Sequence, residues 1–322
     1  MLYLNTDDLN HIGIRWNNTV NVIERAAACL DTGDFSQPVK PYVRFKDPAN
    51  RIIAMPAYVG ETFSMAGLKW IASFPHNIDQ GIQRAHSVTV LNDSSTGVPL
   101  SVINSGLISG IRTASVSGLV IQKFLQAKKA SGLTAGIIGF GPIGQLHLRM
   151  MMELFPESIQ KVLLYDIRQV DENDIPDSIK ERVQICRSWE EVYLQSDILM
   201  TCTVSSHRYI DKKPKDGSLL LNVSLRDFKS DIYDYTQTIA VDDWEEVCRE
   251  NTDIEMMHQV KGLRKEDTFS IVDIVTGGVL ERLTSSEAVM FNPMGMAVFD
   301  IAIGSYYYHQ AAASGIGTEL KG

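Results

Sequence analysis

The sequence predicts an α/β protein with two domains, and three observations support that prediction. The chain has 322 residues, about the length of two domains. From Thr134 onward, apolar strand-like runs alternate with helical segments, as in a parallel sheet with crossover helices. Before Ser115, short strand-like runs follow one another, which indicates a mixed or antiparallel sheet. We therefore predict a smaller α+β domain (1–115 with 293–322) and a Rossmann-type domain with a parallel sheet (116–292).

The α+β part is predicted from its spacing and turn residues. Residues 19–33 carry apolar side chains at helical spacing. Short apolar runs then predict strands, and Asn92 to Gly97 reads as a hairpin turn. The expected strands are 41–45, 51–55, 66–71, 87–91 and 98–104. A final helix is expected to start with Asn292 as its cap and Pro293 in the first turn, and to close at Gly315.

The Rossmann-type part begins with a long helix of small residues, 109–129, with a basic end and Gly132 just beyond. Strands and helices then alternate to residue 241. The expected strands are 135–139, 162–166, 198–203, 219–223 and 239–241, and the expected helices are 145–154 and 190–195.

Composition excludes several classes of function. The formal net charge is −9 and basic residues form no dense patch, which argues against a nucleic-acid partner. No apolar run approaches the roughly 18 residues that span a bilayer, so we expect no membrane partner. The four cysteines are scattered and no signal-peptide pattern begins the chain, so we expect a cytoplasmic location. Histidine and cysteine spacing supports no metal site.

A glycine turn predicts a dinucleotide site. Gly139, Gly141 and Gly144, with Pro142 and Ile143 between them, lie between a strand and a helix. Such glycines permit a tight turn, close approach to a pyrophosphate, and helix–strand packing. Asp166 follows about 20 residues on, where a carboxylate accepts hydrogen bonds from ribose hydroxyls. The alternative is an ordinary glycine-rich turn.

The cofactor assignment turns on the residues at the end of the next strand. Arg168 offers an alternative contact for a 2′-phosphate. Asp166 would repel that phosphate, so we predict NAD.

Two further strand ends carry polar residues. One expected strand ends in Thr201, Cys202 and Thr203, and another is followed by Ser224 to Asp227. Ligands of open α/β sheets bind at the carboxyl ends of strands, so these positions are candidates. Asp227 is a candidate acid or base, although it also suits the cap of a helix beginning near Phe228.

The chain resembles the ornithine cyclodeaminase/μ-crystallin family along essentially its whole length. Five segments in the same order carry the resemblance: Gly67–Lys69, Ser109–Ser115, Gly139–Gly144, Asn222–Asp227 and Gly295–Asp300. Further segments resemble the family's dehydrogenases that supply 2,3-diaminopropionate: Lys40–Arg44, Arg51–Pro56, Val241–Trp244 and Asn292–Ala297. The family's usual R-T-A-A reads Arg112-Thr113-Ala114-Ser115 here.

The resemblance implies roles for particular residues. Lys69 and Asp227 would be catalytic. Substrate would contact Arg44, Arg112, Lys69 and Met55. NAD would contact Arg112, Thr113, the glycine turn (Gly139, Gly141, Pro142, Ile143, Gly144), Asp166, and Thr201 to Thr203. Simpler readings remain: Lys69 as a solvated strand residue, Arg44 in a surface ion pair, and Met55 in the core.

The resemblance also implies a reaction: NAD-dependent oxidation of N-(2-amino-2-carboxyethyl)-L-glutamate, followed by imine hydrolysis to 2,3-diaminopropionate and 2-oxoglutarate. It would supply a siderophore or antibiotic precursor. Three alternatives stay open: an ornithine cyclodeaminase, which recycles NAD; an imine reductase or amino-acid dehydrogenase; and a μ-crystallin-like binding protein without turnover. The family resemblance further implies a homodimer formed through the N-terminal sheet, in the domain that binds substrate.

Overall fold

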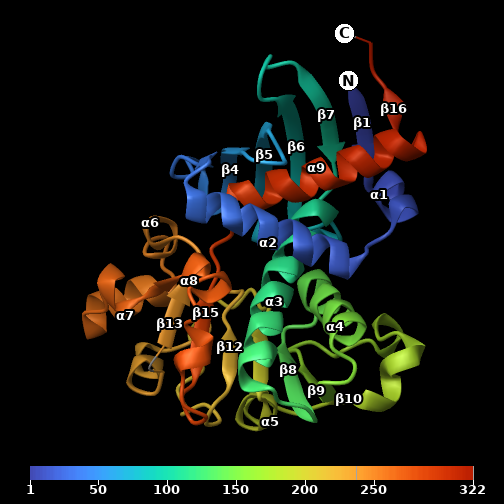
Figure 1. Cartoon of the computed structure of the whole chain (residues 1–322). Helices are drawn as coiled ribbons and strands as arrows, with labels where there is room; N and C mark the ends of the chain where they lie inside the picture. Colours follow the sequence, from blue (N-terminus) through green and yellow to red (C-terminus); the bar gives the residue numbers. More distant parts are fainter. Residues whose placement is uncertain (237, 322) are drawn as a thin grey trace. The chain divides into compact units, whose positions relative to one another are not determined.

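The computed structural model describes residues 1–236 and 238–321, and it confirms the predicted α/β class (Figure 1). The chain forms two compact units. Unit 1 comprises Met1–Arg112 and Gly295–Gly322, and unit 2 comprises Thr113–Met294. The boundaries fall inside helix α3 (Leu107–Lys128) and between Met294 and Gly295.

Unit 1 contains a mixed sheet in the order β16-β1-β7-β6-β5-β4-β2, with β3 paired to β4. Helix α9 packs on β4, β5 and β6, and α1 and α2 pack against α9. The strands are β1 (Leu2–Asn5), β2 (Phe35–Ser36), β3 (Tyr42–Phe45), β4 (Asp47–Val59), β5 (Met65–Ser73), β6 (Ala85–Asp93), β7 (Pro99–Asn104) and β16 (Thr318–Glu319). The helices are α1 (Thr6–Ile12), α2 (Trp16–Thr32), the 3-10 helix η1 (Pro75–Gln80) and α9 (Ala297–Ser314).

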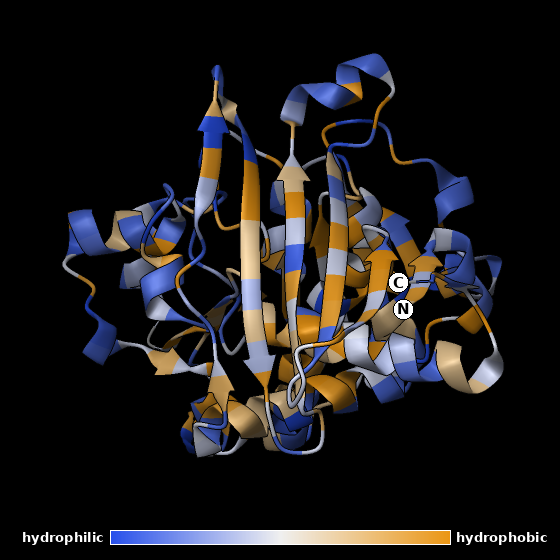
Figure 2. Ribbon diagram, turned by 90° about the horizontal axis from the view of Figure 1, so that it is seen from above, coloured by the Kyte–Doolittle hydropathy of each residue, from blue (hydrophilic) through white to orange (hydrophobic). Residues whose placement is uncertain are grey.

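Strand alternation decides which side chains of this sheet are buried. Lys69 on β5 is opposite Met55 on β4 and Thr89 on β6, and all three are buried. Cross-strand partners share one face, and neighbours along a strand point to opposite faces. Trp70 therefore lies on the other face, where it is 43% exposed. Figure 2 shows the alternation as bands of hydrophobic and hydrophilic colour along the long strands.

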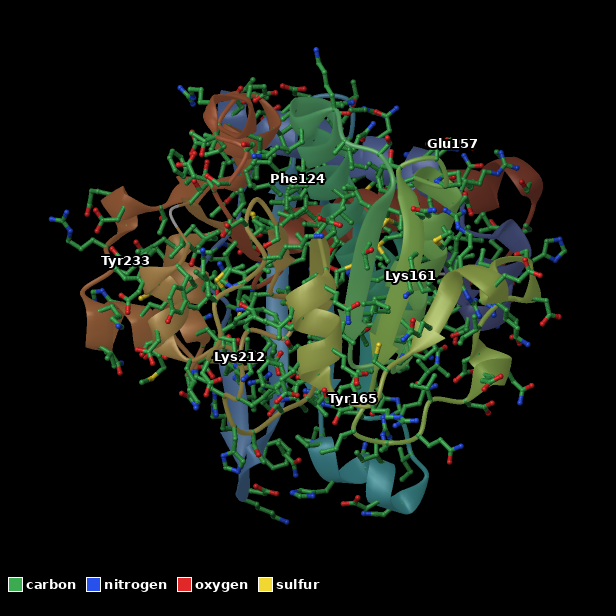
Figure 3. The ribbon with its side chains drawn as sticks, turned by 90° about the horizontal axis from the view of Figure 1, so that it is seen from below. Phe124, Glu157, Lys161, Tyr165, Lys212 and Tyr233 are labelled. Atoms are coloured by element: carbon green, nitrogen blue, oxygen red, sulfur yellow. The ribbon has the colours of Figure 1, made fainter. Side chains whose placement is uncertain are left out.

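Unit 2 contains a parallel sheet in the order β10-β9-β8-β11-β12-β15-β13-β14. The strands are β8 (Leu133–Ile138), β9 (Ile159–Tyr165), β10 (Val183–Ile185), β11 (Ile198–Thr201), β12 (Leu219–Leu221), β13 (Thr238–Val241), β14 (Phe269–Ser270) and β15 (Val289–Asn292). The central strands are wholly buried and mainly apolar, as expected for a parallel sheet covered on both faces. Figure 3 shows Lys161 and Tyr165 on β9 and Phe124 on α3.

The helices of unit 2 lie between these strands along the chain. They are α4 (Pro142–Leu154), α5 (Trp189–Gln195), α6 (Trp244–Val247), α7 (Asp253–Lys261) and α8 (Ile271–Val275), with 3-10 helices η2 (Glu172–Asp174), η3 (Asp177–Arg182), η4 (Ser230–Asp234), η5 (Lys265–Asp267) and η6 (Leu280–Arg282). In the described part of the chain, none of the helices combines the length and apolar character needed to cross a bilayer.

The predicted start of the last helix is wrong. Asn292 is the final residue of β15, where it is opposite Val241 of β13, and α9 begins only at Ala297. The Asn292 amide is part of a buried network, because Asn222 Nδ2 donates to Asn292 Oδ1 at 2.9 Å. The predicted end is confirmed, since Gly315 caps α9 with φ of 65°.

Candidate functional site

The first group of candidate residues lies in unit 1 and centres on Lys69. Its Nζ atom is 2.7 Å from Asp300 Oδ2 and donates a hydrogen bond to Ser109 Oγ at 3.3 Å. The side chain is only 1% exposed. The pKa of Lys69 is lowered to about 8: burial is the main cause, Arg112 and Lys40 act in the same direction, and Asp300 opposes them. An amine with such a pKa exchanges protons readily near neutral pH.

Arg112 shares the same carboxylate from the first turns of α3. Its Nε atom donates to Asp300 Oδ1 at 2.9 Å. The guanidinium also lies against the bare backbone of Gly295, where a Cβ would be only 2.6 Å from Arg112 Nη1. Gly295 has φ of 89°, so it suits this position on both grounds.

Asp300, on α9, joins Lys69 and Arg112 although all three are distant in sequence. Burial opposes its ionisation, but the charges of Arg112 and Lys69 hold its pKa below the usual value. Its segment is one of the five that carry the family resemblance, but that resemblance gave Asp300 no role. A buried acid three residues into an apolar helix is the available signal, because such an acid requires a charged partner.

Two other basic residues in the first part of the chain, Lys40 and Arg44, differ in burial. Lys40 is 3% exposed, and it immediately precedes Pro41, whose carbonyl accepts from Ala54 N. Continuing the β3–β4 register places Lys40 opposite Met55, in the row that contains Lys69. Arg44 is exposed on β3, with its guanidinium carbon 5.3 Å from the ring centroid of Tyr42. Lys40, which sequence reasoning left without a role, is thus nearer to Lys69 in the sheet than Arg44.

The second group lies in unit 2, at the carboxyl ends of the strands. Gly139 has φ of 93°, and a Cβ there would be 2.7 Å from the carbonyl carbon of Cys202. Gly144 packs directly on the Gly139 carbonyl. Around an added Cβ at Gly141, by contrast, the described residues leave open space to 4 Å. The outer two glycines serve the protein's own packing, and the middle one leaves room for a ligand.

Asp166 follows β9 and is hydrogen-bonded to the glycine turn. Its Oδ2 atom accepts from Phe140 N at 2.7 Å, and its Oδ1 atom accepts from Arg168 N at 2.8 Å. Gly141 precedes α4 with Pro142 in the first turn, so backbone N–H groups begin the helix beside the open space. These groups fit a dinucleotide: the N–H groups can donate to phosphate, and the carboxylate can accept from ribose hydroxyls.

The last residue of β11 and the two residues after it bind neighbouring protein groups. Cys202 N donates to Ile138 O at 2.7 Å, which ties β11 to β8 beside Gly139. Thr201 Oγ1 donates to Asn222 Oδ1 at 3.2 Å, and Thr203 Oγ1 donates to Asp227 Oδ1 at 2.5 Å. The two threonine hydroxyls therefore connect the end of β11 with the turn that carries Asp227.

Asp227 lies in the turn after β12 and is fully buried. Its carboxylate also accepts a short hydrogen bond from Ser224 Oγ. Burial raises the pKa of Asp227 to about 6, and the neighbouring Asp253 contributes in the same direction. The alternative reading of Asp227 as a helix cap is wrong, because the nearest helical turn, η4, begins at Ser230 after Lys229.

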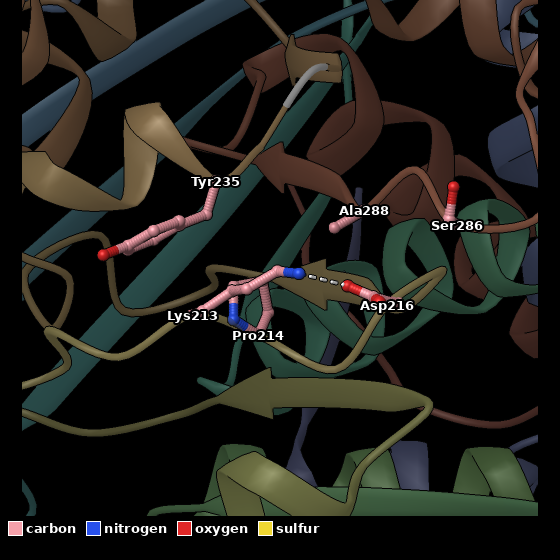
Figure 4. Close-up of a pocket in the computed structure, with 6 residues that line it drawn as sticks. All are labelled: Lys213, Pro214, Asp216, Tyr235, Ser286 and Ala288. Carbon is pink, nitrogen blue, oxygen red and sulfur yellow. Dashed lines mark ion pairs between the residues drawn. The ribbon is translucent and has the colours of Figure 1, made fainter.

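A separate cavity in unit 2, of about 230 Å³, lies near the amino end of β12 (Figure 4). It is lined by Lys213, Pro214, Asp216, Tyr235, Ser286 and Ala288. Lys213 and Asp216 form an ion pair of 2.7 Å there. Ligands of open α/β sheets bind at the carboxyl edge, so we do not assign this cavity to the cofactor.

Comparisons with known proteins agree with this fold along the whole chain. A model of the ornithine cyclodeaminase/mu-crystallin family matches residues 9–315. The chain is 33% identical to the N-((2S)-2-amino-2-carboxyethyl)-L-glutamate dehydrogenase of Staphylococcus aureus, over 100% of this chain and 98% of the relative. It is 25% identical to an alanine dehydrogenase of Archaeoglobus fulgidus, with 96% and 94% covered.

The fold is also similar to solved structures over the whole chain. A Thermococcus litoralis Δ1-pyrroline-2-carboxylate reductase, in complex with NADH and L-proline, superposes with a TM-score of 0.90 at 26% identity, covering 99% and 100% of the two chains. An archaeal alanine dehydrogenase dimer with bound NAD gives 0.86 at 24% identity, covering 100% and 99%.

These results define the class: an NAD-dependent enzyme acting on C–N bonds, as dehydrogenases, reductases and cyclodeaminases do. The chain belongs to the ornithine cyclodeaminase/mu-crystallin family.

Proposed function

We propose that this enzyme oxidises N-(2-amino-2-carboxyethyl)-L-glutamate with NAD and releases 2,3-diaminopropionate and 2-oxoglutarate. The observation that carries the proposal is the buried cluster of Lys69 and Arg112 around the single carboxylate of Asp300. Lys40 adds a further positive charge that acts on Lys69. A substrate with several carboxylates suits such a site, and the similarity to the Staphylococcus aureus enzyme supports this substrate.

In this proposal Arg112 and Lys69 hold a carboxylate of the substrate. The planar guanidinium of Arg112 fixes the angle of the carboxylate, and Asp300 fixes the guanidinium. Lys69, with its pKa of about 8, takes up and returns a proton at the reacting nitrogen. Met55 forms the apolar wall beside Lys69, and Arg44 gives a peripheral contact.

Asp227 is proposed to activate the water that hydrolyses the imine. Thr203 and Ser224 orient its carboxylate, and its raised pKa lets it hold or release a proton near neutral pH. NAD, when bound, supplies the oxidant. The glycine turn, Asp166, Arg112, Thr113 and the segment Thr201 to Thr203 are proposed to hold it.

An end-point assay tests this function. Purified protein with NAD and N-(2-amino-2-carboxyethyl)-L-glutamate should produce NADH, 2-oxoglutarate and 2,3-diaminopropionate in equal amounts. Ornithine is the matched alternative, because the family model includes cyclodeaminases. Conversion of ornithine to proline and ammonia without lasting NADH, together with no turnover of the glutamate conjugate, would replace the proposal.

We also propose a homodimer formed through the face of the unit 1 sheet that lies opposite α9. That face carries Trp70 and its two cross-strand neighbours, Ala54 on β4 and Val88 on β6. An exposed apolar patch on a sheet commonly marks an interface. On this proposal unit 1 binds substrate and forms the dimer, and unit 2 binds NAD. We further propose that the product, 2,3-diaminopropionate, serves as a precursor of siderophores or antibiotics.

A further inference from the structure

We propose that Asp253 is a positioning residue that fixes the turn bearing Asp227 and places its own carboxylate beside that turn. This inference rests on the proposed role of Asp227. It adds a residue that neither the motifs nor the family resemblance singled out.

One oxygen atom of Asp253 holds both ends of the turn. Asp253 is the first residue of α7 and is fully buried. Its Oδ2 atom accepts from Asn222 Nδ2 at 3.0 Å, from Asp227 N at 3.1 Å and from Phe228 N at 3.1 Å. Asn222 directly follows β12, so this carboxylate fastens the turn to the end of that strand as well as to Asp227 itself.

The backbone around this carboxylate is strained. Leu225, Glu250 and Asn251 have φ of 64°, 64° and 57°, the left-handed region that residues other than glycine rarely adopt. Such conformations persist only where surrounding contacts enforce them, and they gather at functional sites. Here Asp253 N donates to Leu225 O at 2.8 Å, and Arg226 Nη2 donates to Glu250 O at 2.8 Å. These two hydrogen bonds thus hold the backbone carbonyls of two of the strained residues, Leu225 and Glu250.

Arg208 keeps this carboxylate in place. Its Nε atom donates to Asp253 Oδ1 at 2.7 Å, and its Nη2 atom donates to Asn251 O at 2.7 Å. Arg208 therefore holds the second oxygen of Asp253 and the backbone just before α7 together. The hydrogen bond described between Asp253 and Asp227 uses the backbone N–H of Asp227, so Asp253 acts by fixing geometry and by its charge.

The charge of Asp253 has a definite effect on Asp227. Among the described residues, the other titratable or charged groups that face Asp227 or Asp253 include Cys202, Arg208 and Tyr209, all of which follow β11. Asp253 places negative charge beside Asp227 and so favours the protonated form of the Asp227 carboxyl group. An acid or base of catalysis works best when its pKa is near the operating pH, which Asp253 promotes.

The test measures the proton affinity of Asp227 without turnover. The full-length protein is unfolded in urea across pH, with and without Asp227→Asn, and the stability difference is plotted. Ionised Asp227 penalises the folded state, so the advantage of Asp227→Asn grows as pH rises and levels off above the folded-state pKa. When both proteins also carry Asp253→Asn, we expect the stability advantage of Asp227→Asn to level off at a lower pH.

Asp197→Asn is the matched control. Asp197 also lies in unit 2, accepts from the backbone N–H of Thr134, and pairs with Lys215. Among the described residues, the Asp197 side chain is not hydrogen-bonded to the Asp227 turn, so the pH at which the stability difference levels off should not move. An unchanged value in the Asp253→Asn background would overturn the electrostatic part of the proposal.

Activity tests the positioning part. Asp253→Asn should lower kcat about tenfold to a hundredfold, because small misplacements of a reacting group are that costly. Asp253→Glu keeps the charge but lengthens the side chain, so kcat should fall while the levelling pH stays near the parent value. Full activity in Asp253→Glu would overturn positioning. Parent-rate turnover in Asp227→Asn would instead refute the role of Asp227, and the substrate-free titration would still test Asp253.

Discussion

Asp300 Oδ2 lies 2.7 Å from Lys69 Nζ, and both side chains are almost completely removed from solvent. The other oxygen of Asp300 accepts from Arg112, so one carboxylate serves two cations. A buried pair of this kind adds little net stability, but removing one partner leaves an uncompensated charge. Asp300 therefore matters most for where the two cations lie.

The first prediction concerns Asp300→Asn. Loss of the carboxylate should destabilise unit 1 by about 3–5 kcal/mol, since two buried cations lose their shared counter-ion. Urea unfolding measures this effect. Asp177→Asn is the control, because Asp177 pairs with Lys180 at the exposed surface and its loss should leave the curve unchanged. Equal effects in the two variants would contradict the prediction.

The second prediction concerns pH and Lys69. Its folded-state pKa of about 8 lies below the ordinary value of 10.5, so the unfolded chain binds more protons between those values. Through this group, stability should rise with pH from about 8 to 10.5. The comparison is urea unfolding of the parent and Lys69→Met across that range. A stability difference between them that does not change with pH would show that Lys69 titrates normally.

The third prediction separates two glycines of one turn. Gly139→Ala should destabilise the fold, because the residue has φ of 93° and a Cβ would strike the backbone of Cys202. Gly141→Ala should keep the parent melting temperature, since its Cβ enters open space among the described residues, but should weaken NAD binding. Thermal melts and NADH fluorescence titrations measure the two properties. Parent NAD affinity in Gly141→Ala would place the cofactor elsewhere.

The fourth prediction tests the proposed dimer. Trp70→Glu should convert the protein to monomers without unfolding it, because the side chain lies on the exposed face of β5. Light scattering during size exclusion measures the mass. Val98→Glu is the control, since Val98 is an exposed apolar residue in the loop before β7. A parent protein that elutes as a monomer would remove the proposal.

Local patterns predicted much of the fold. The glycine turn, the strands beside it and the central helices depend on residues near one another in sequence. Short strands at the sheet edges, such as β2, β14 and β16, were not predicted, because two residues carry too little pattern. Asn292 was misassigned because its strand conformation depends on β13, about fifty residues away.

The candidate site shows the same division. Lys69, Arg112 and Asp227 were chosen by the motifs around them, and the structure gives each a buried, charged environment. Their partners were invisible in sequence. Arg112 and Asp300 are 188 residues apart, and no periodicity relates them. Arg44 and Lys40 lie four positions apart, and only the sheet register decides which is buried.

The interruption of unit 1 by unit 2 sets an order of events during synthesis. Lys69 and Arg112 leave the ribosome before any of unit 2 does, and Asp300 follows only after unit 2 is complete. Because nascent chains fold as their segments emerge, the parallel sheet from β8 to β15 has all its strands before α9 exists. Until α9 is synthesised, Lys69 and Arg112 lack the carboxylate of Asp300 and remain solvated. The last helix to be made therefore closes the first part of the chain.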